Sequence, residues 1–367
     1  MKILEIANVD FSLRQFVLPL MRGIRARGHE VVGVSADGPL LADIRAEGFR
    51  VVAIPFARRL SPRAHLRAFA ALVALLRAEK PDLVHAHMPI SGLLARLAAR
   101  VAGVPRIAYT GHGFWFNAPG SPARRVLGFA MEWLGARCTD IYMTVSTEEA
   151  ADAQRLGIAA RAVAIGNGRD PARFRPDPVA RARIRAELGV APGRPVILAA
   201  SRLVRHKGYP ELAAAMRAVP AAEVWVAGAR LASDRGPDMA AVLAGAGLGS
   251  RLRMLGYRAD MPALMAAADV FVLPSHFEGL PMAVIEAMLC GLPVVATAIR
   301  GPREQVVPEV TGLLVPPGDA APLAAALARL AADPGLRAAM GAAGRARAVD
   351  RFDESKVIAR TLDLLGL

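Results

Sequence analysis

Short apolar segments alternate with helix-like segments along almost the whole chain, and this alternation limits the possible fold more than any other feature. Such an alternation is typical of parallel sheets covered by helices on both faces. A stretch rich in Pro, Arg and Asp, residues 167–178, interrupts the rhythm once. Because 367 residues suffice for two hydrophobic cores, we predict an α/β protein with two Rossmann-like domains.

The predicted domains are residues 1–168 and 169–350, followed by a C-terminal helix over 351–367. Ligands of such sheets bind beyond the carboxyl ends of the strands, and the motifs described below all fall at such ends. The predicted strands are Lys2–Ala7, Glu30–Ser35, Arg50–Ile54, Leu83–His87, Arg106–Thr110 and Ile141–Val145, then Val196–Ala200, Glu223–Ala227, Arg251–Leu255, Val270–Leu273, Val294–Thr297 and Leu313–Val315.

A pair of carboxylates, Glu278 and Glu286, brackets the turn between a predicted strand and a predicted helix. We expect this helix to start at Pro281 and to stop at Cys290, because Gly291 suits the left-handed position after a helix. The helix N-terminus offers N–H groups to a phosphate, and Gly279 allows close approach of the backbone. The carboxylates would then accept hydrogen bonds from ligand hydroxyls. A helix with one solvated and one N-terminal glutamate explains the pair equally well.

Basic side chains follow the first strand of the second domain. Arg202 and Lys207 could both reach one diphosphate, the arginine through forked hydrogen bonds and the lysine as a compact charge. Only 4 of the 46 basic residues are lysines, so a lysine at 207 indicates a specific need. A solvated loop lysine remains an alternative.

Three histidines follow strands of the first domain. His112 lies between two glycines and can project from its turn, whereas His85 and His87 share one face of their strand. His87 is a candidate for binding a second substrate, with a structural histidine as the alternative. Asp10, Ser12 and Arg14, in a predicted loop over Asn8–Phe16, are candidates for the same side.

Four motifs in order resemble those of glycosyltransferase family 4, a retaining group with the GT-B fold. The E-x7-E spacing is similar to its donor-site signature, and the other three motifs are SRLVRHKG (201–208), NGRDPARFRPD (167–177) and YTGHGFWF (109–116). The nearest likeness is to bacterial enzymes of exopolysaccharide and capsule assembly. The first loop departs from the family pattern, because it lacks the Gly-Gly pair found in many members.

The resemblance implies two domains facing across a cleft, with the last helix returning to the N-terminal domain. It implies transfer of a hexose or N-acetylhexosamine from a nucleoside-diphosphate sugar, with UDP as the expected nucleotide, to a glycan or polyprenyl-linked acceptor. The implied catalytic group comprises His112, Glu278, Arg202 and Lys207. The implied donor-binding group comprises Glu286, Gly279, Leu280, Pro281, Gly256 and Tyr257, the last two beside the nucleobase unless they form an ordinary turn with a half-buried tyrosine.

No metal or other cofactor is expected, since two cations and a helix N-terminus can stabilise the leaving diphosphate. The two distant cysteines, Cys138 and Cys290, favour a reduced cytoplasmic protein. Glu5 interrupts any signal-peptide core, and the run Ala68–Leu76 is too short to span a bilayer. A sugar-nucleotide epimerase and a basic binding protein without turnover are the alternative functions.

The net charge of +14 is concentrated in residues 51–137, where 12 Lys and Arg stand against 3 Asp and Glu. Phe114, Trp115 and Phe116 lie within this basic stretch and are expected to be exposed. Cations beside exposed aromatics suit docking on an anionic membrane at the inner face of the cell membrane. A solvated basic face explains the charge equally well. Nucleic acid is not an expected partner, because no nucleic-acid-binding motif accompanies the charge. Eight of the 12 flank an apolar helix-like segment or follow the aromatics, namely Arg58, Arg59, Arg63, Arg67, Arg77, Lys80, Arg124 and Arg125.

Overall fold

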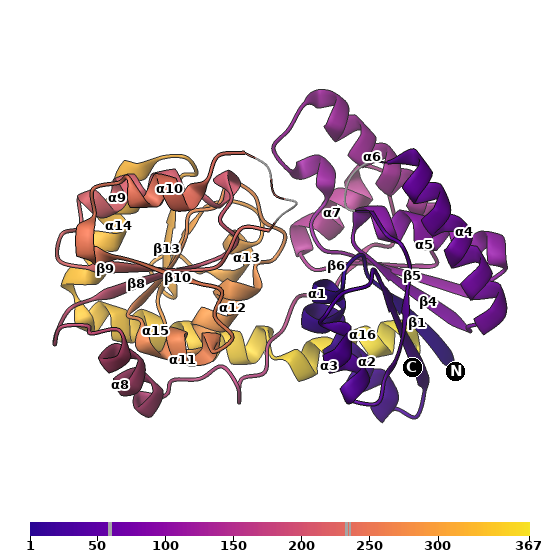
Figure 1. Ribbon diagram of the computed structural model, residues 1–367, viewed down its shortest axis with the longest axis horizontal. Coiled ribbons are helices and arrows are strands. Elements are labelled where there is room, and N and C mark those ends of the chain that lie inside the picture. Colours follow the sequence, from indigo (N-terminus) through magenta and orange to yellow (C-terminus); the bar gives the residue numbers. More distant parts are fainter. Residues whose placement is uncertain (58–60, 232–233, 235) are drawn as a thin grey trace. The chain divides into compact units, whose positions relative to one another are not determined.

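The computed structural model describes residues 1–57, 61–231, 234 and 236–367. The chain forms two compact units, which Figure 1 shows coloured along the sequence. Unit 1 comprises Met1–Gly166 together with Ser355–Leu367, and unit 2 comprises Asn167–Glu354.

Unit 1 is built on a seven-stranded parallel sheet in the order β3-β2-β1-β4-β5-β6-β7. All six predicted strands of this half are confirmed to within about a residue at their ends, because strands buried on both faces read as apolar runs. The short β7 was missed. The strands are β1 (Lys2–Ile6), β2 (Glu30–Ser35), β3 (Arg50–Ala53), β4 (Leu83–His87), β5 (Arg106–Gly111), β6 (Ile141–Thr144) and β7 (Val163–Ala164).

Helices cover both faces of this sheet. One face packs against η1, α2, α3 and α16, and the other packs against α4, α5 and α7. The helices are α1 (Asp10–Ser12), the π-helical η1 (Leu13–Val17), α2 (Leu18–Ala26), α3 (Leu41–Ala46), α4 (Pro62–Glu79), α5 (Pro89–Ala102), the 3₁₀ turn η2 (Trp115–Asn117), α6 (Pro122–Ala136), α7 (Thr147–Arg155) and α16 (Glu354–Leu365).

The prediction of a loop over Asn8–Phe16 was wrong, because a helix begins at Asp10 and runs through η1 into α2. Leu13, Val17 and Met21 recur along it and are fully buried against the sheet. Pro19 lies in the first turn of α2, directly after the π-helical segment.

The C-terminal helix α16 belongs to unit 1, and its yellow ribbon lies beside the indigo α2 in Figure 1. Leu362 and Leu365 are buried in the core that α2 also covers. Arg106 donates a hydrogen bond from Nη2 to the carbonyl of Leu365 at 2.7 Å, which fixes the end of the helix to the start of β5.

Unit 2 repeats the same plan with a six-stranded parallel sheet in the order β10-β9-β8-β11-β12-β13. In each sheet the strand order reverses once, between β1 and β4 in unit 1 and between β8 and β11 in unit 2. The strands are β8 (Val196–Ala200), β9 (Glu223–Ala227), β10 (Leu252–Gly256), β11 (Val270–Leu273), β12 (Val294–Thr297) and β13 (Gly312–Val315). The helices are α8 (Pro178–Glu187), η3 (Arg205–Lys207), α9 (Tyr209–Arg217), α10 (Met239–Ala244), η4 (Gly249–Arg251), α11 (Met261–Ala267), α12 (Met282–Leu289), α13 (Pro302–Gln305), α14 (Ala320–Ala332) and α15 (Pro334–Arg351).

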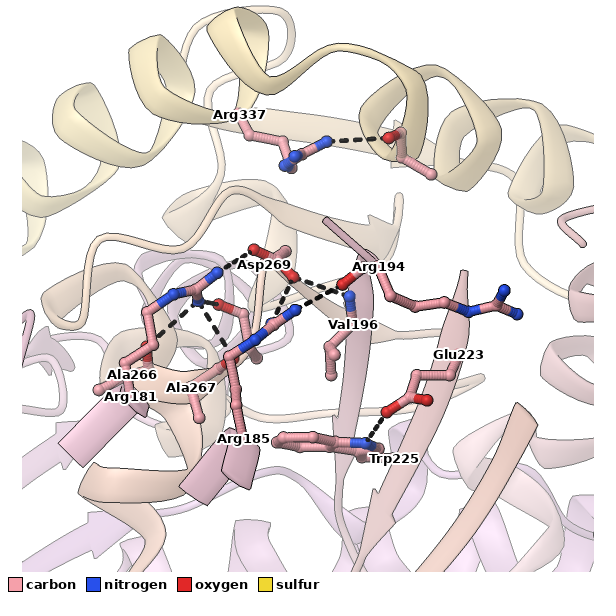
Figure 2. A network of polar contacts seen from close by, with 12 residues as sticks. Arg181, Arg185, Arg194, Val196, Glu223, Trp225, Ala266, Ala267, Asp269 and Arg337 are labelled. Carbon is pink, nitrogen blue, oxygen red and sulfur yellow. Dashed lines mark hydrogen bonds and ion pairs between the residues drawn. The ribbon is translucent and has the colours of Figure 1, made fainter. Parts of the chain in front are cut away.

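A polar network fastens α8 to the amino end of the unit 2 sheet (Figure 2). Asp269, just before β11, accepts hydrogen bonds from Arg181 at 2.7 Å and from Arg185 at 3.0 Å. Its second oxygen also accepts the backbone N–H of Val196 at 2.8 Å. One carboxylate therefore joins a helix to two strands.

Asp269→Ala is expected to lower the free energy of unfolding of unit 2 by about 3 kcal/mol, because it leaves two arginines without their carboxylate. Urea denaturation followed by fluorescence measures this loss. Glu187→Ala, also on α8 but exposed, is the matched control and should change stability by less than about 0.5 kcal/mol. An equal loss for both variants would contradict the role of the network.

Candidate functional site

The candidate site of unit 2 lies where β8 and β11 end side by side. Lys207 follows β8 and Glu278 follows β11, and the Nζ of Lys207 lies 2.6 Å from Oε1 of Glu278. The two side chains are only 15% and 10% exposed. The structure thus brings together two of the predicted catalytic residues as a largely buried ion pair.

A glycine explains why the two loops can meet. Gly208 adopts φ 75°, and a Cβ at this position would collide with the carbonyl oxygen of Pro274 at the end of β11. Behind it, the hydroxyl of Tyr209 lies 2.8 Å from Oγ of Ser201. The turn that carries Lys207 therefore packs against the end of β11, and the contact between Tyr209 and Ser201 links it to the end of β8.

Arg202 reaches the same region from the end of β8. Its Nη1 lies 2.7 Å from Asp234, and its side chain is 44% exposed. Burial is the main cause that lowers the pKa of His206 to about 4, and the positive charges of Lys207 and then Arg202 add to it. The charges of Lys207 and Arg202 therefore both act at His206, as we expect if the two cations bind a single diphosphate.

The second carboxylate of the pair, Glu286, lies within α12 and contacts a different cation. Its Oε1 is 2.7 Å from Nε of Arg169. Two residues before Arg169, Asn167 donates a hydrogen bond to the carbonyl of Leu280 at 2.8 Å. The segment at 167–169 thus holds the turn formed by Gly279, Leu280 and Pro281.

The boundaries of α12 agree with the prediction at its end and shift slightly at its start. Pro281 is the N-cap residue rather than the first helical residue. The helix ends at Leu289 with Cys290 as its C-cap, and Gly291 takes φ 77° as expected.

The turn at Gly256 and Tyr257 ends β10. The carbonyl of Gly256 accepts a hydrogen bond from the N–H of Gly228 at 2.7 Å. The Tyr257 ring is 67% exposed, so the alternative of a half-buried tyrosine was wrong. An exposed ring beside a strand end is able to stack on a planar ligand.

In unit 1, a chain of polar side chains lies on one face of the sheet across β1, β4 and β5. His85 contacts Thr110 (Nε2 to Oγ1, 2.8 Å) and Glu5 (Nδ1 to Oε1, 3.0 Å). His87 contacts Glu5 (Nε2 to Oε2, 2.8 Å) and His112 (Nδ1 to Nε2, 3.1 Å). The predicted common face of His85 and His87 is confirmed, since both reach the same carboxylate.

Glu5, His85 and His87 are buried and His112 is partly buried, and burial together with mutual contacts sets the charge states of Glu5, His87 and His112. Burial alone would raise the pKa of Glu5, but attraction to His85 and hydrogen bonds from His85 and His87 outweigh it and lower the pKa to about 2. Burial also lowers the pKa of His87 to about 4, and it lowers the pKa of His112 well below its ordinary value. At neutral pH Glu5 is therefore ionised, while His87 and His112 are uncharged.

Glu5, His85 and His87 also form a group that could hold a metal ion, with one ligand atom from each within 4.8 Å of the others. In the structure both ring nitrogens of each histidine lie within hydrogen-bond distance of a neighbouring side chain. Those contacts satisfy the buried groups without an ion.

The other predicted residues of the first domain all have contacts within unit 1. His87 is buried, with both ring nitrogens engaged, which favours the alternative of a structural histidine at this position. Asp10 accepts the backbone N–H groups of Phe11 and Leu40. Ser12 is buried and donates to Asn8, and Arg14 pairs with Asp43 at 2.6 Å.

The expected exposure of all three aromatics at 114–116 was also wrong. Phe114 and Phe116 are buried and stack with ring centroids 5.0 Å apart. Apolar side chains are exposed instead on one face of α6. Of the basic residues named above, Arg58 and Arg59 lie outside the described residues. The exposed side chains on α6 are Val126, Leu127, Trp133 and Leu134.

Four partners in these clusters were missed from the sequence, namely Glu5, Asn167, Arg169 and Asp234. A signal existed for Glu5, because an ionisable residue inside a buried parallel strand needs a partner. The x-His-x-His pattern of β4, adjacent in the sheet, could supply it.

Two family models match the chain, and the boundary between their matches lies close to the boundary between units 1 and 2. Residues 14–173 match the family model described as "Glycosyltransferase Family 4", and residues 180–347 match "Glycosyl transferases group 1". A protein of Bacillus subtilis (strain 168) that carries the glycosyltransferase name EpsD is 32% identical, over 99% of this chain and 96% of its own.

Two further relatives extend the comparison. An Escherichia coli enzyme named UDP-Gal:alpha-D-GlcNAc-diphosphoundecaprenol alpha-1,3-galactosyltransferase is 29% identical, over 89% of this chain and 86% of its own. The crystal structure of Anabaena HepE in complex with UDP has a TM-score of 0.83 at 25% identity and covers 100% of both chains. The two Rossmann-like units therefore have the GT-B fold, and the chain belongs to the family 4, group 1 glycosyltransferases.

Proposed function

We propose that this glycosyltransferase moves a hexose or N-acetylhexosamine from a UDP-sugar to a polyprenyl-linked glycan in bacterial surface polysaccharide synthesis, with retention of the anomeric configuration. The observation that carries the proposal is the buried pair of Lys207 and Glu278 at the reversal point of the unit 2 sheet. A cation and a carboxylate held together there can bind two parts of one ligand. The lysine would bind the diphosphate, and the glutamate would accept a hydrogen bond from a sugar hydroxyl.

The names of the relatives support the donor and the acceptor. HepE was crystallised with UDP, and the Escherichia coli enzyme is named for a UDP-galactose donor and a diphosphoundecaprenol-linked acceptor. The name EpsD supports a role in exopolysaccharide or capsule assembly.

The proposed roles follow from chemistry at each position. Lys207 and Arg202 stabilise the negative charge that develops on the leaving UDP, which is the main electrostatic demand of the reaction. Glu278 accepts hydrogen bonds from the donor sugar. Glu286 exchanges part of its contact with Arg169 for the ribose hydroxyls. The turn over 279–281 faces the phosphates, and Gly256 and Tyr257 face the base.

On the side of unit 1, His112 binds a hydroxyl of the donor sugar. Asp10, Ser12 and Arg14 remain candidates for the acceptor side, and each would have to exchange an internal contact for the acceptor. No protein nucleophile attacks the anomeric carbon in this scheme. The acceptor hydroxyl enters on the face that UDP leaves, within a tight ion pair.

The test is transfer from a panel of UDP- and GDP-sugars to a polyprenyl-diphosphate GlcNAc acceptor, with excess EDTA and with the acceptor omitted. We expect turnover with one UDP-sugar, unchanged by EDTA, and an α-linked product from an α-linked donor by NMR. Isomerisation of the donor without acceptor would support the epimerase alternative instead. An inverted product or a strict need for a divalent cation would contradict the mechanism.

We also place membrane docking on the exposed face of α6. Among the described residues no helix is both long and apolar enough to cross a bilayer, so contact would be with the surface. Val126 and Trp133 lie seven residues apart on this face, and Arg137 lies over the Trp133 ring at 4.1 Å. Apolar side chains flanked by cations suit anionic lipid headgroups.

Trp133→Ser is expected to weaken sedimentation with phosphatidylglycerol vesicles about three- to tenfold, because a partly buried aromatic contributes on the order of 1 kcal/mol at such a surface. Val179→Ser, on α8 of unit 2, is the matched control, since Val179 is the more exposed side chain at 80%. An equal effect of both variants would place the contact elsewhere, and insensitivity to salt would contradict the role of the cations.

A further inference from the structure

The chain of side chains in unit 1 ends at a histidine with one ring nitrogen engaged. Nε2 of His112 lies 3.1 Å from His87, whereas its Nδ1 has no hydrogen-bond partner among the residues that the structure describes. His112 is also less buried than the other side chains of this cluster. Glu5, His85, His87 and Thr110 are all nearly inaccessible to solvent. Of this cluster, His112 is the member placed to meet a ligand.

The ionised state of Glu5 determines which ring nitrogen of each neighbouring histidine carries a proton. An ionised carboxylate only accepts hydrogen bonds, so the nitrogen of each histidine that faces it carries a proton. For His87 that nitrogen is Nε2, at 2.8 Å. Because His87 is uncharged, its Nδ1 is then without a proton and can only accept.

The same rule extends one step further. The nitrogen of His112 that faces the bare Nδ1 of His87 must be the donor, so the proton of His112 lies on Nε2. An uncharged His112 then presents a bare Nδ1 on its other side. The ring of Phe16, from the π-helical η1, lies beside His112 with ring centroids 6.1 Å apart.

We propose that Glu5 and His87 are positioning residues that hold His112 in the single tautomer with a protonated Nε2, so that Nδ1 of His112 acts only as a hydrogen-bond acceptor. The ligand group at this position must then be a donor, such as a sugar hydroxyl or an N–H. A phosphate oxygen or a carbonyl is excluded there. The inference deepens the proposed function, because it names the polarity of the contact with the sugar.

The direct test requires no substrate. The intact protein is labelled with ¹⁵N-histidine, and the ring nitrogens of His87 and His112 are observed by NMR at neutral pH, with His87→Gln and His112→Gln used for assignment. We expect a protonated Nε2 and a bare Nδ1 on both rings, with coupling across the hydrogen bond between them. A protonated Nδ1 on either ring, a doubly protonated His112 or a mixture of its tautomers would overturn the proposal.

The second test uses the donor sugar that the enzyme turns over. Each hydroxyl is replaced in turn by fluorine, which cannot donate a hydrogen bond. At the position facing His112, we expect the fluorinated donor to react about tenfold more slowly with the wild-type protein, the value of one hydrogen bond. His112→Ala should abolish this difference and thereby identify the position.

His87→Phe separates positioning from simple packing. It keeps a ring beside His85 and His112 but removes the acceptor for Nε2 of His112. We expect the penalty for the fluorinated donor to shrink in this variant, and its melting temperature to fall because Glu5 also loses the hydrogen bond from His87. A loss of activity that is equal for the hydroxyl and fluorinated donors would show a merely structural role and overturn the proposal. His29→Phe, on the surface near the N-terminus, is the matched control and should retain the wild-type penalty.

Failure of the proposed function can be distinguished from failure of the tautomer proposal. If no nucleotide-sugar is turned over, the proposed function fails while the tautomer measurement still stands. If turnover is found but Nδ1 of His112 carries a proton, only the positioning chain is wrong.

Discussion

Lys207→Ala is expected to lower kcat for sugar transfer by about 10²–10³-fold, the range seen when one preorganised donor to a developing negative charge is removed. The lysine is held 2.6 Å from Glu278 and is largely buried, so its charge is poorly screened by water. The charge on UDP grows as the glycosidic bond breaks, so the loss should fall on kcat more than on KM. Steady-state rates with saturating donor and acceptor measure it.

Two controls make this result specific. Lys356→Ala removes a lysine from the exposed part of α16 and should leave kcat within about twofold of wild type, because screened surface charges contribute little. The double variant Lys207→Ala with Glu278→Ala should be nearly as active as the weaker single variant, since the two residues act as a unit. Full additivity, or a kcat within about threefold of wild type for Lys207→Ala, would contradict the proposed site.

Binding can be measured apart from turnover. UDP at a hundred times its dissociation constant should add roughly 2.7 kcal/mol to the stability of the wild-type protein, seen as a rise in melting temperature. We expect this rise to be smaller in Lys207→Ala and unchanged in Lys356→Ala. The same loss in both variants would indicate damage to the fold rather than to the site.

The strands were the part of the fold that the sequence predicted best. Val196–Ala200 and Val294–Thr297 match β8 and β12 residue for residue, because a strand buried on both faces is a nearly continuous apolar run. The two-residue β7 carried too little pattern to be seen. The start of the chain misled prediction for another reason, since a π-helical segment shifts the apolar period just before Pro19.

The candidate site was predicted only in part, because motifs show which residues follow strands but not which partners they take. Lys207 and Glu278 were predicted to act on one ligand, and their mutual contact became visible only in the structure. Glu286 and Arg169 lie 117 residues apart in the sequence, and no local pattern links them. His112 was identified from its flanking glycines, whereas its dependence on Glu5 required the register between β1 and β4.

Burial of the aromatics at 114–116 was missed for a related reason. In a sequence, aromatics beside glycines and arginines are equally compatible with exposure and with a small core beneath a loop. Phe114 fills such a core, and its N–H donates to Glu149 at 2.7 Å. A contiguous exposed apolar face of unit 1 lies on α6, where residues at i, i+1, i+7 and i+8 repeat.

Another buried carboxylate, Glu132 on α6, carries the largest stability prediction. It accepts hydrogen bonds from the hydroxyls of Tyr109 at 2.8 Å and Tyr142 at 3.0 Å. Arg96, fully buried, lies 3.3 Å from it and stacks over the Tyr109 ring at 3.7 Å. One carboxylate thus compensates a buried cation and satisfies two buried hydroxyls.

Glu132→Ala is therefore expected to lower the free energy of unfolding of unit 1 by about 3–5 kcal/mol, because it leaves Arg96 as an uncompensated buried charge. This is a large part of the roughly 5–15 kcal/mol that stabilises a typical domain. Urea denaturation measures the change, with Trp115 and Trp133 as fluorophores in unit 1 and Trp225 in unit 2. The transition of unit 2 should be the less affected of the two.

The size of this effect depends on charge compensation rather than on the volume of the side chain. Glu132→Leu fills most of the space but leaves Arg96 unpaired, so it should cost nearly as much as alanine. Adding Arg96→Met to Glu132→Leu removes the stranded charge, and the double variant should recover about 1–3 kcal/mol relative to the sum of the single variants. Glu30→Ala, at an exposed ion pair of the same unit, should cost less than about 0.5 kcal/mol. If the alanine variant at 132 costs as little as the one at 30, the buried carboxylate does not hold α6 against the sheet.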